Sequence, residues 1–132
     1  MEPGRIGIVS RSPAIADEVL RQLSAYGLGA SKVVHLPAHG ATHLAALKMF
    51  SDHWGTDAVL LVGAIDASEE RACTDWIAGH TDKPVFGFID PADPDHAQAA
   101  RLSASGVHMS GDAATLGDLI AAQVDCPWLP FD

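Results

Sequence analysis

The stretch GRIGIVSRSPAIADEVLRQL, residues 4–23, changes its periodicity partway through. The run at 5–9 is typical of a buried strand, whereas the apolar residues that follow recur every three to four positions, which is typical of a helix. Ser12 followed by Pro13 provides an N-cap and a first-turn proline, and Gly27 can adopt the left-handed conformation that ends a helix. We therefore predict a strand that runs directly into a helix.

This strand-to-helix pattern recurs along the chain. Further short apolar runs alternate with helix-like segments, and they lie at 32–36, 58–63, 84–89 and 106–109. Four later helices are predicted. The first spans about 40–51, and the second begins at Ser68 and ends at Gly79. The third begins at Asp93–Pro94 and is closed by Gly106, and the fourth spans 112–122. Because the middle runs are almost continuously apolar, they suit parallel strands covered on both faces. The predicted fold is α/β, a flavodoxin-like three-layer sandwich with a five-stranded parallel sheet and helices on both faces.

Length and composition favour one domain over 1–132, with an extended C-terminal tail at 123–132. The net charge is -9, with 17 acidic residues against 8 Lys and Arg, and the basic residues form no stripe. We expect neither a nucleic-acid nor a membrane partner. No export signal is evident in MEPGRIGIVS, and Cys73 and Cys126 lack metal or redox spacing, so a cytoplasmic protein with two reduced thiols is expected.

The first strand-to-helix turn is the main candidate site. Ligands in this architecture bind beyond the carboxyl ends of the strands, and a helix start presents free N–H groups to an anion. Ser10 and Ser12 add hydroxyl groups, Arg11 adds a positive charge, and the backbone at Ala14 adds an amide. The alternative is that Ser12 only caps the helix while Arg11 is solvated.

A second candidate region follows the second strand, in VVHLPAHGATHL. His39 and His43 have i, i+4 spacing and His35 precedes them, which raises the hypothesis of a metal site. Since the stretch has no HExxH glutamate and no acid, we expect no metal. These imidazoles would instead bind an anion or act as acids and bases beside Ser10 and Ser12, the weak catalytic candidates being Ser10, Ser12, His39 and His43. Serine catalysis is disfavoured because the turn is not GxSxG.

The run GRIGIVSRSPAIADEVLRQLSAYGLG resembles the start of the second, ligase domain of the succinyl-CoA synthetase α subunit, and more widely of NDP-forming acyl-CoA synthetases and ATP-citrate lyase. Further similar segments follow in the same order, and they are LKMFSDHWGTDAVLLVGAIDASEERACTDWI, TDKPVFGFI and AARLSASGVHMSGDAATLGDLI. The resemblance covers nearly all of 4–120. It implies a turn whose helix N-terminus holds the phosphate of a phosphohistidine.

The chain departs from that family in the residues that transfer phosphate. The resemblance implies a glycine-rich phosphohistidine loop after the fourth strand, but PVFGFIDPADPDHAQAARL has only His96, without flanking glycines. Ala64 stands where the family has the glutamate that pairs with the phosphohistidine, and Asp66 is more simply a helix cap. Pro13 replaces a glycine and removes one N–H donor.

Two hypotheses follow, from different functional classes. The leading one is a stand-alone, catalytically degenerate ligase domain that binds an anionic ligand or a partner subunit, either as a homodimer or with an ATP-grasp or CoA-binding chain. It has no cofactor of its own, because no GxGxxG or GxxxxGK[ST] motif is present, and CoA or phosphate would come through the partner. The alternative is a small enzyme acting on a carboxylate, acyl phosphate or thioester. A phosphoacceptor regulator is disfavoured because the first strand ends in serines instead of acids.

Overall fold

The computed structural model describes residues 5–36, 42–53, 56–80 and 83–123. Five parallel strands form one sheet in the order β2-β1-β3-β4-β5. The strands are β1 (Ile6–Ser10), β2 (Ala30–His35), β3 (Ala58–Val62), β4 (Val85–Phe88) and β5 (His108–Ser110). The helices are α1 (Pro13–Ala25), α2 (His43–Asp52), α3 (Glu70–His80), α4 (Gln98–Ala104), the short 3-10 helix η1 (Ala113–Thr115) and α5 (Leu116–Gln123). This architecture confirms the predicted flavodoxin-like fold.

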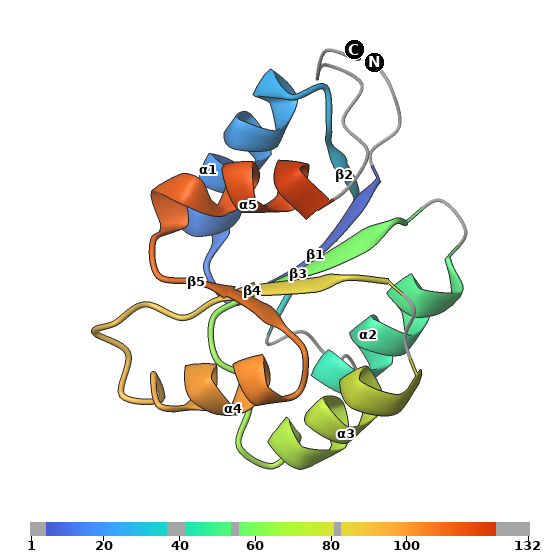
Figure 1. Ribbon diagram of the computed structural model, residues 1–132, viewed down its shortest axis with the longest axis vertical. Coiled ribbons are helices and arrows are strands. Elements are labelled where there is room, and N and C mark those ends of the chain that lie inside the picture. The colour runs from blue at the N-terminus through green and yellow to red at the C-terminus, as the bar shows by residue number, and fades with distance from the viewer. Residues whose placement is uncertain (1–4, 37–41, 54–55, 81–82, 124–132) are drawn as a thin grey trace.

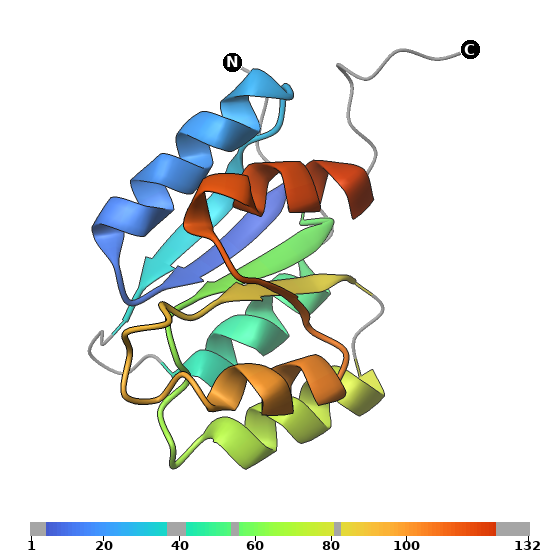
Figure 2. The ribbon, with the colours of Figure 1, turned by 60° about the vertical axis from the view of Figure 1, so that its left-hand side comes forward.

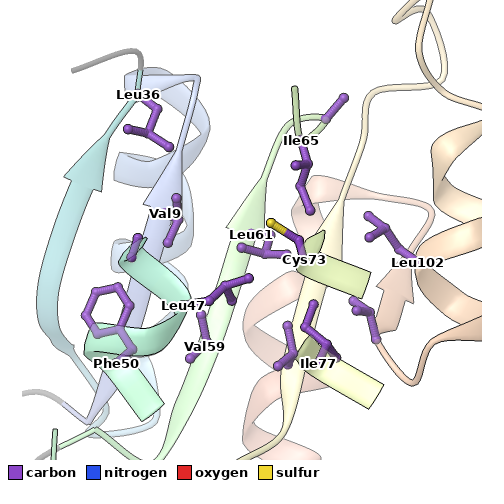
Figure 3. Packing of buried hydrophobic residues seen from close by; sticks show 14 of the residues in the cluster. Val9, Leu36, Leu47, Phe50, Val59, Leu61, Ile65, Cys73, Ile77 and Leu102 are labelled. Atoms are coloured by element: carbon purple, nitrogen blue, oxygen red, sulfur yellow. The ribbon is translucent and has the colours of Figure 1, made fainter. Parts of the chain in front are cut away.

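The helices cover both faces of the sheet. Figure 1 shows α1 and α5 on one side and α2, α3 and α4 on the other. On the second side, Phe50 and Leu47 of α2 and Cys73 of α3 point toward the strands (Figure 3). All five residues of β1 and of β3 are buried, as expected for central strands between two helical layers. Each layer therefore closes its own apolar core against the sheet.

The start of α1 confirms the local signals in the sequence. Ser12 is the N-cap, and its Oγ accepts the N–H of Ile15 at 3.4 Å. Pro13 is the first helical residue, where its missing N–H costs nothing. Gly27 has φ of 73°, so it ends the helix in the left-handed conformation that glycine tolerates.

Several predicted boundaries are wrong by a few residues. Helix α2 begins at His43, because the side chain of Thr42 caps it. Helix α4 begins at Gln98 instead of beside Asp93–Pro94, because the Asp93 carboxylate accepts the N–H of Asp95 and forms a separate turn first. Helix α3 continues through Gly79 to His80. The fifth strand lies at His108–Ser110, slightly later than predicted. The tail predicted over 123–132 starts one residue later, because Gln123 still belongs to α5, and the rest of it lies outside the described residues.

The topology brings the ends of three strands together at one edge. Arg11 follows β1 and its backbone N–H donates to the carbonyl of Val62, at 3.0 Å. The N–H of Gly63, just after β3, donates to Phe88 of β4 at 2.8 Å. Figure 2 shows the start of α1 at the same edge as the loops that follow β3 and β4. No helix in the described ranges has the length and apolar character that crossing a membrane requires.

Candidate functional site

A pocket of about 450 Å³ opens at the carboxyl ends of β1, β3 and β4. Its floor includes Val62 and Phe88, at the ends of β3 and β4. The full set of lining residues is Arg11, Ser12, Ile15, Val62, Gly63, Ala64, Phe88, Asp90, Asp93 and Asp95. The pocket therefore lies at the edge where ligands bind in parallel α/β sheets.

Ser10 shapes the turn at this pocket. The residue is fully buried, its Oγ donates to the carbonyl of Ser12 at 2.8 Å, and the same Oγ accepts the N–H of Ser12 at 2.9 Å. Both hydrogen bonds stay inside the turn. Ser10 thus holds the backbone in place, while Ser12, Arg11 and the first turn of α1 face the pocket opening. Ala14 lies exposed in that first turn.

Arg11 crosses from β1 to the loop after β3. Its guanidinium donates to the carbonyl of Ala64 at 3.0 Å. A Cβ placed on Gly63 would lie 3.2 Å from the Cβ of Arg11, so glycine leaves the space in which the arginine stem lies. Within the described ranges, the hydrogen bond to Ala64 is the one that holds this guanidinium. Its remaining N–H groups are the strongest donors for an anion at this edge.

Part of the pocket lining is acidic. Asp90, Asp93 and Asp95 follow β4 in the segment that leads to α4, and all three line the pocket with Arg11. One oxygen of Asp90 accepts the N–H of Ala92 at 2.9 Å. A ligand here meets one guanidinium and three carboxylates. The three carboxylates outnumber the one guanidinium, so the lining as a whole repels negative charge, and Arg11 is the side chain of this lining that attracts it.

His43 does not join the serine turn. It is 3% exposed at the first position of α2, and its Nδ1 lies 3.9 Å from a carboxylate oxygen of Glu69. The other oxygen of Glu69 accepts the N–H of Leu44 at 3.4 Å. Burial lowers the pKa of His43, against the opposing effect of Glu69. The imidazole therefore packs between α2 and the loop before α3.

The remaining candidate histidines are placed separately. His35 ends β2 as the register neighbour of Ser10, and it is exposed. His39 lies outside the described residues. His96 is exposed in the segment before α4. In the part of the chain that the structure describes, no hydrogen bond joins Ser10 or Ser12 to a histidine, and no three His, Cys, Asp or Glu side chains are grouped to hold a metal ion.

Ala64 and Asp66 both lie in the loop that follows β3. Ala64 is buried and contributes its carbonyl to Arg11. The carboxylate of Asp66 accepts the backbone N–H and the hydroxyl of Ser68, each at 3.0 Å, and the backbone N–H is the main cause that lowers the pKa of Asp66. Asp66 thus acts on the turn that leads to α3.

Sequence reasoning missed part of this site. The sequence analysis assigns Asp93 to a helix start and does not single out Asp90 or Asp95, although the end of a parallel strand is itself the signal that places them at the ligand edge. Gln98 was missed as well. It is 2% exposed and hydrogen-bonds to both backbone groups of Ile65. No spacing in the sequence indicates that contact.

The parallel sheet, the helices on both faces and a pocket at the carboxyl ends of the strands define a flavodoxin-like α/β protein. No family model matches the chain. Among curated proteins, the chain is 43% identical over 89 residues to the succinate–CoA ligase [ADP-forming] subunit alpha of Aquifex aeolicus, covering 65% of this chain and 29% of that protein. It is 32% identical over 128 residues to the same-named subunit of Staphylococcus epidermidis, covering 93% of this chain and 41% of that protein.

The chain therefore spans less than half the length of these two curated relatives. Among solved structures, the ATP citrate lyase of Methanothrix soehngenii in complex with citrate and coenzyme A superposes with a TM-score of 0.70 at 14% identity, covering 99% of this chain and 28% of that one. A diflavin flavoprotein A3 from Nostoc superposes with a TM-score of 0.53 at 15% identity, covering 92% and 96%. These similarities confirm the fold and the resemblance to the CoA-ligase domain: the chain is CoA-ligase-like.

Proposed function

We propose that this CoA-ligase-like domain does not transfer phosphate itself, and that it binds a small anion at the pocket beside the start of α1. The observation that carries the proposal is the guanidinium of Arg11, which lies at the first turn of α1 and lines the pocket with Ser12. Free N–H groups of a helix start and an arginine together favour a carboxylate or phosphate. The three aspartates of the lining oppose this binding, so the ligand that we propose is an anion of small size and low charge, for which their repulsion is least.

The absence of phosphoryl transfer is supported by two features of the chain. Ala64 lies at the position for which the family resemblance implies a glutamate, and its methyl group cannot orient an imidazole. Residues 89–97 alone connect β4 to α4, where the resemblance implies a phosphohistidine loop. His96 is the one histidine in this connection. The domain thus keeps the anion-binding turn without a carrier for the phosphate.

The proposal is tested by titrating the ¹⁵N-labelled chain with inorganic phosphate, acetate and pyrophosphate. We expect saturable NMR shifts at Arg11 and in the first turn of α1, with pyrophosphate gaining nothing over phosphate. Arg11→Met should weaken phosphate binding about tenfold, the loss expected for one charge-assisted hydrogen bond. Arg71→Met is the matched control, since Arg71 lies exposed on α3 and pairs with Asp75. Equal phosphate affinity in both variants would contradict the proposal.

A partner subunit is a second proposal, and the comparisons favour it. The curated relatives are named as alpha subunits, and this chain matches less than half of each. We propose an ATP-grasp or CoA-binding chain as the partner, through which CoA or phosphate would reach this domain. Purification at native level from the cytoplasm, followed by mass spectrometry and light scattering, should recover such a chain. Recovery of a homodimer alone would overturn the partner proposal and leave the anion site to be tested by itself.

The geometry does not favour the alternative of a small enzyme. That alternative requires a histidine within hydrogen-bond reach of a serine or of the ligand, whereas His43 packs against Glu69 and the Ser10 hydroxyl is held inside the turn. His35 lies beside Ser10 in the sheet register but forms no hydrogen bond with it in the described structure. We therefore retain binding, and not catalysis, as the proposed function.

A further inference from the structure

Gln98 connects the two walls of the pocket. It begins α4, so it directly follows the segment that carries Asp90, Asp93 and Asp95. Its side chain is almost fully buried and reaches across to the loop after β3. There its Oε1 accepts the N–H of Ile65 at 2.7 Å, and its Nε2 donates to the carbonyl of Ile65 at 2.8 Å. Both backbone groups of one residue are thus paired with one amide side chain.

The contact with Ile65 lies next to the hydrogen bond that holds Arg11. Ala64 immediately precedes Ile65, and the carbonyl of Ala64 accepts the guanidinium N–H of Arg11 at 3.0 Å. Gln98 is itself held from outside, because its Nε2 also donates to Glu70 at 3.1 Å, and Glu70 forms an ion pair with Arg101. A continuous chain of hydrogen bonds therefore runs from the surface of α4 to the guanidinium.

We propose that Gln98 is a positioning residue for the anion pocket: it fixes the loop after β3 so that the Ala64 carbonyl orients the guanidinium of Arg11 toward the ligand. This inference rests on the proposed function, because it assigns a role to Gln98 at the same pocket. An oriented guanidinium binds more tightly than a mobile one, since less side-chain entropy is lost on binding. Gln98 acts through Arg11 and does not line the pocket itself.

The chain offers a closely matched control in Gln22. Its Oε1 accepts the N–H of Gly117 at 2.6 Å, while its Nε2 donates to the carbonyl of Ala113 and to Glu18. Gln22 thus joins α1 to η1 and α5 with the same three kinds of hydrogen bond that Gln98 makes. It does not line the pocket. Replacing either glutamine by methionine removes equivalent bonds at different places in the fold.

The first experiment measures the order of Arg11 without any ligand. Side-chain ¹⁵N relaxation of the Arg11 Nε–H group is compared in the wild type, Gln98→Met and Gln22→Met. We expect Gln98→Met to increase the mobility of this group and Gln22→Met to leave it unchanged. Unchanged mobility in both variants would overturn the proposal, even in a protein that binds no phosphate. If the wild type binds no phosphate while Gln98→Met still increases the mobility of Arg11, the proposed function is overturned and only the ordering of Arg11 by Gln98 stands.

The second experiment is a double-mutant cycle with phosphate as the probe. Gln98→Met should weaken phosphate binding several-fold, and the double variant with Arg11→Met should bind no more weakly than Arg11→Met by itself. If the fold-losses in phosphate affinity of the two single variants multiply in the double variant, Gln98 does not act through Arg11. If Gln98→Met fails to fold, hydrogen exchange of the Ile65 amide in the wild type tests the proposal instead. Saturating phosphate should slow this exchange, because a coupling between the Gln98–Ile65 contact and the phosphate site acts in both directions. Unchanged exchange would then count against the proposal.

Discussion

At the scale of single residues, Gly63 is the position where the pocket and the backbone depend on each other. It has φ of 91°, which side chains rarely adopt, and an added Cβ would lie 3.2 Å from Arg11. We predict that Gly63→Ala lowers the free energy of unfolding by about 1–3 kcal/mol. Gly79→Ala is the control, because Gly79 lies in α3 with nothing within 4 Å of its would-be Cβ. It should stabilise by about 0.5–1 kcal/mol, and urea denaturation measures both.

His43 makes stability depend on pH. Burial lowers its pKa from the ordinary 6.5, while Glu69 and Asp66 oppose this effect and Arg11 reinforces it. The unfolded chain therefore binds a proton at His43 more readily than the folded chain does. The contribution of the neutral imidazole to the free energy of unfolding is complete above pH 6.5 and is lost as the pH falls toward the lowered pKa. We predict that His43→Gln loses less stability than the wild type between neutral and mildly acidic pH.

Urea titrations of both proteins at neutral and at mildly acidic pH measure how much free energy of unfolding each protein loses between the two conditions. His96→Gln is the control variant, because His96 is exposed before α4 and buries no ring. An acid sensitivity that is identical in the wild type and in His43→Gln would show that burial of His43 is not linked to folding.

At the scale of elements, α1 and α2 both begin with a hydroxyl side chain as N-cap, and only the cap of α1 lines the pocket. Ser12 caps α1 by accepting the N–H of Ile15, and Thr42 caps α2 by accepting that of Ala45, at 3.0 Å. We predict that Ser12→Ala and Thr42→Ala each cost about 1 kcal/mol of stability. Only Ser12→Ala should also weaken phosphate binding, as measured by NMR titration. Equal affinity in the two variants would mean that Ser12 is a cap and nothing more.

The elements themselves were largely predictable, and their boundaries less so. Ser12, Pro13 and Gly27 act through local backbone geometry, so the sequence alone indicates where α1 begins and ends. Asp93 carries the same kind of signal, yet it forms a turn and α4 starts only at Gln98. That start coincides with the hydrogen bonds from Gln98 to Ile65, a tertiary contact that no local rule contains.

At the scale of the whole molecule, Cys73 reports on opening of the core. It is fully buried in the layer formed by α2, α3 and α4 (Figure 3), and burial raises the pKa of its thiol to about 12. The thiolate is the reactive form of cysteine. The folded protein therefore protects Cys73 both by burying it and by keeping its thiol protonated. We predict that in Cys126→Ser the labelling of Cys73 proceeds only through global unfolding, so its rate should follow the unfolding equilibrium across urea concentrations. Fast labelling without urea would reveal local opening of α3.

The sequence by itself determined the parallel sheet and the helices on both faces, and it predicted the carboxyl edge of the sheet as the place of a site. These follow from continuous apolar runs, helix caps and chain order, which act over a few residues at a time. Tertiary structure decided what that edge can do. Ser10 turned inward, His43 packed against Glu69, and three aspartates came to line the same pocket as Arg11. The physical reason is that charge and hydrogen bonding at a site depend on distances between segments that lie far apart in the chain.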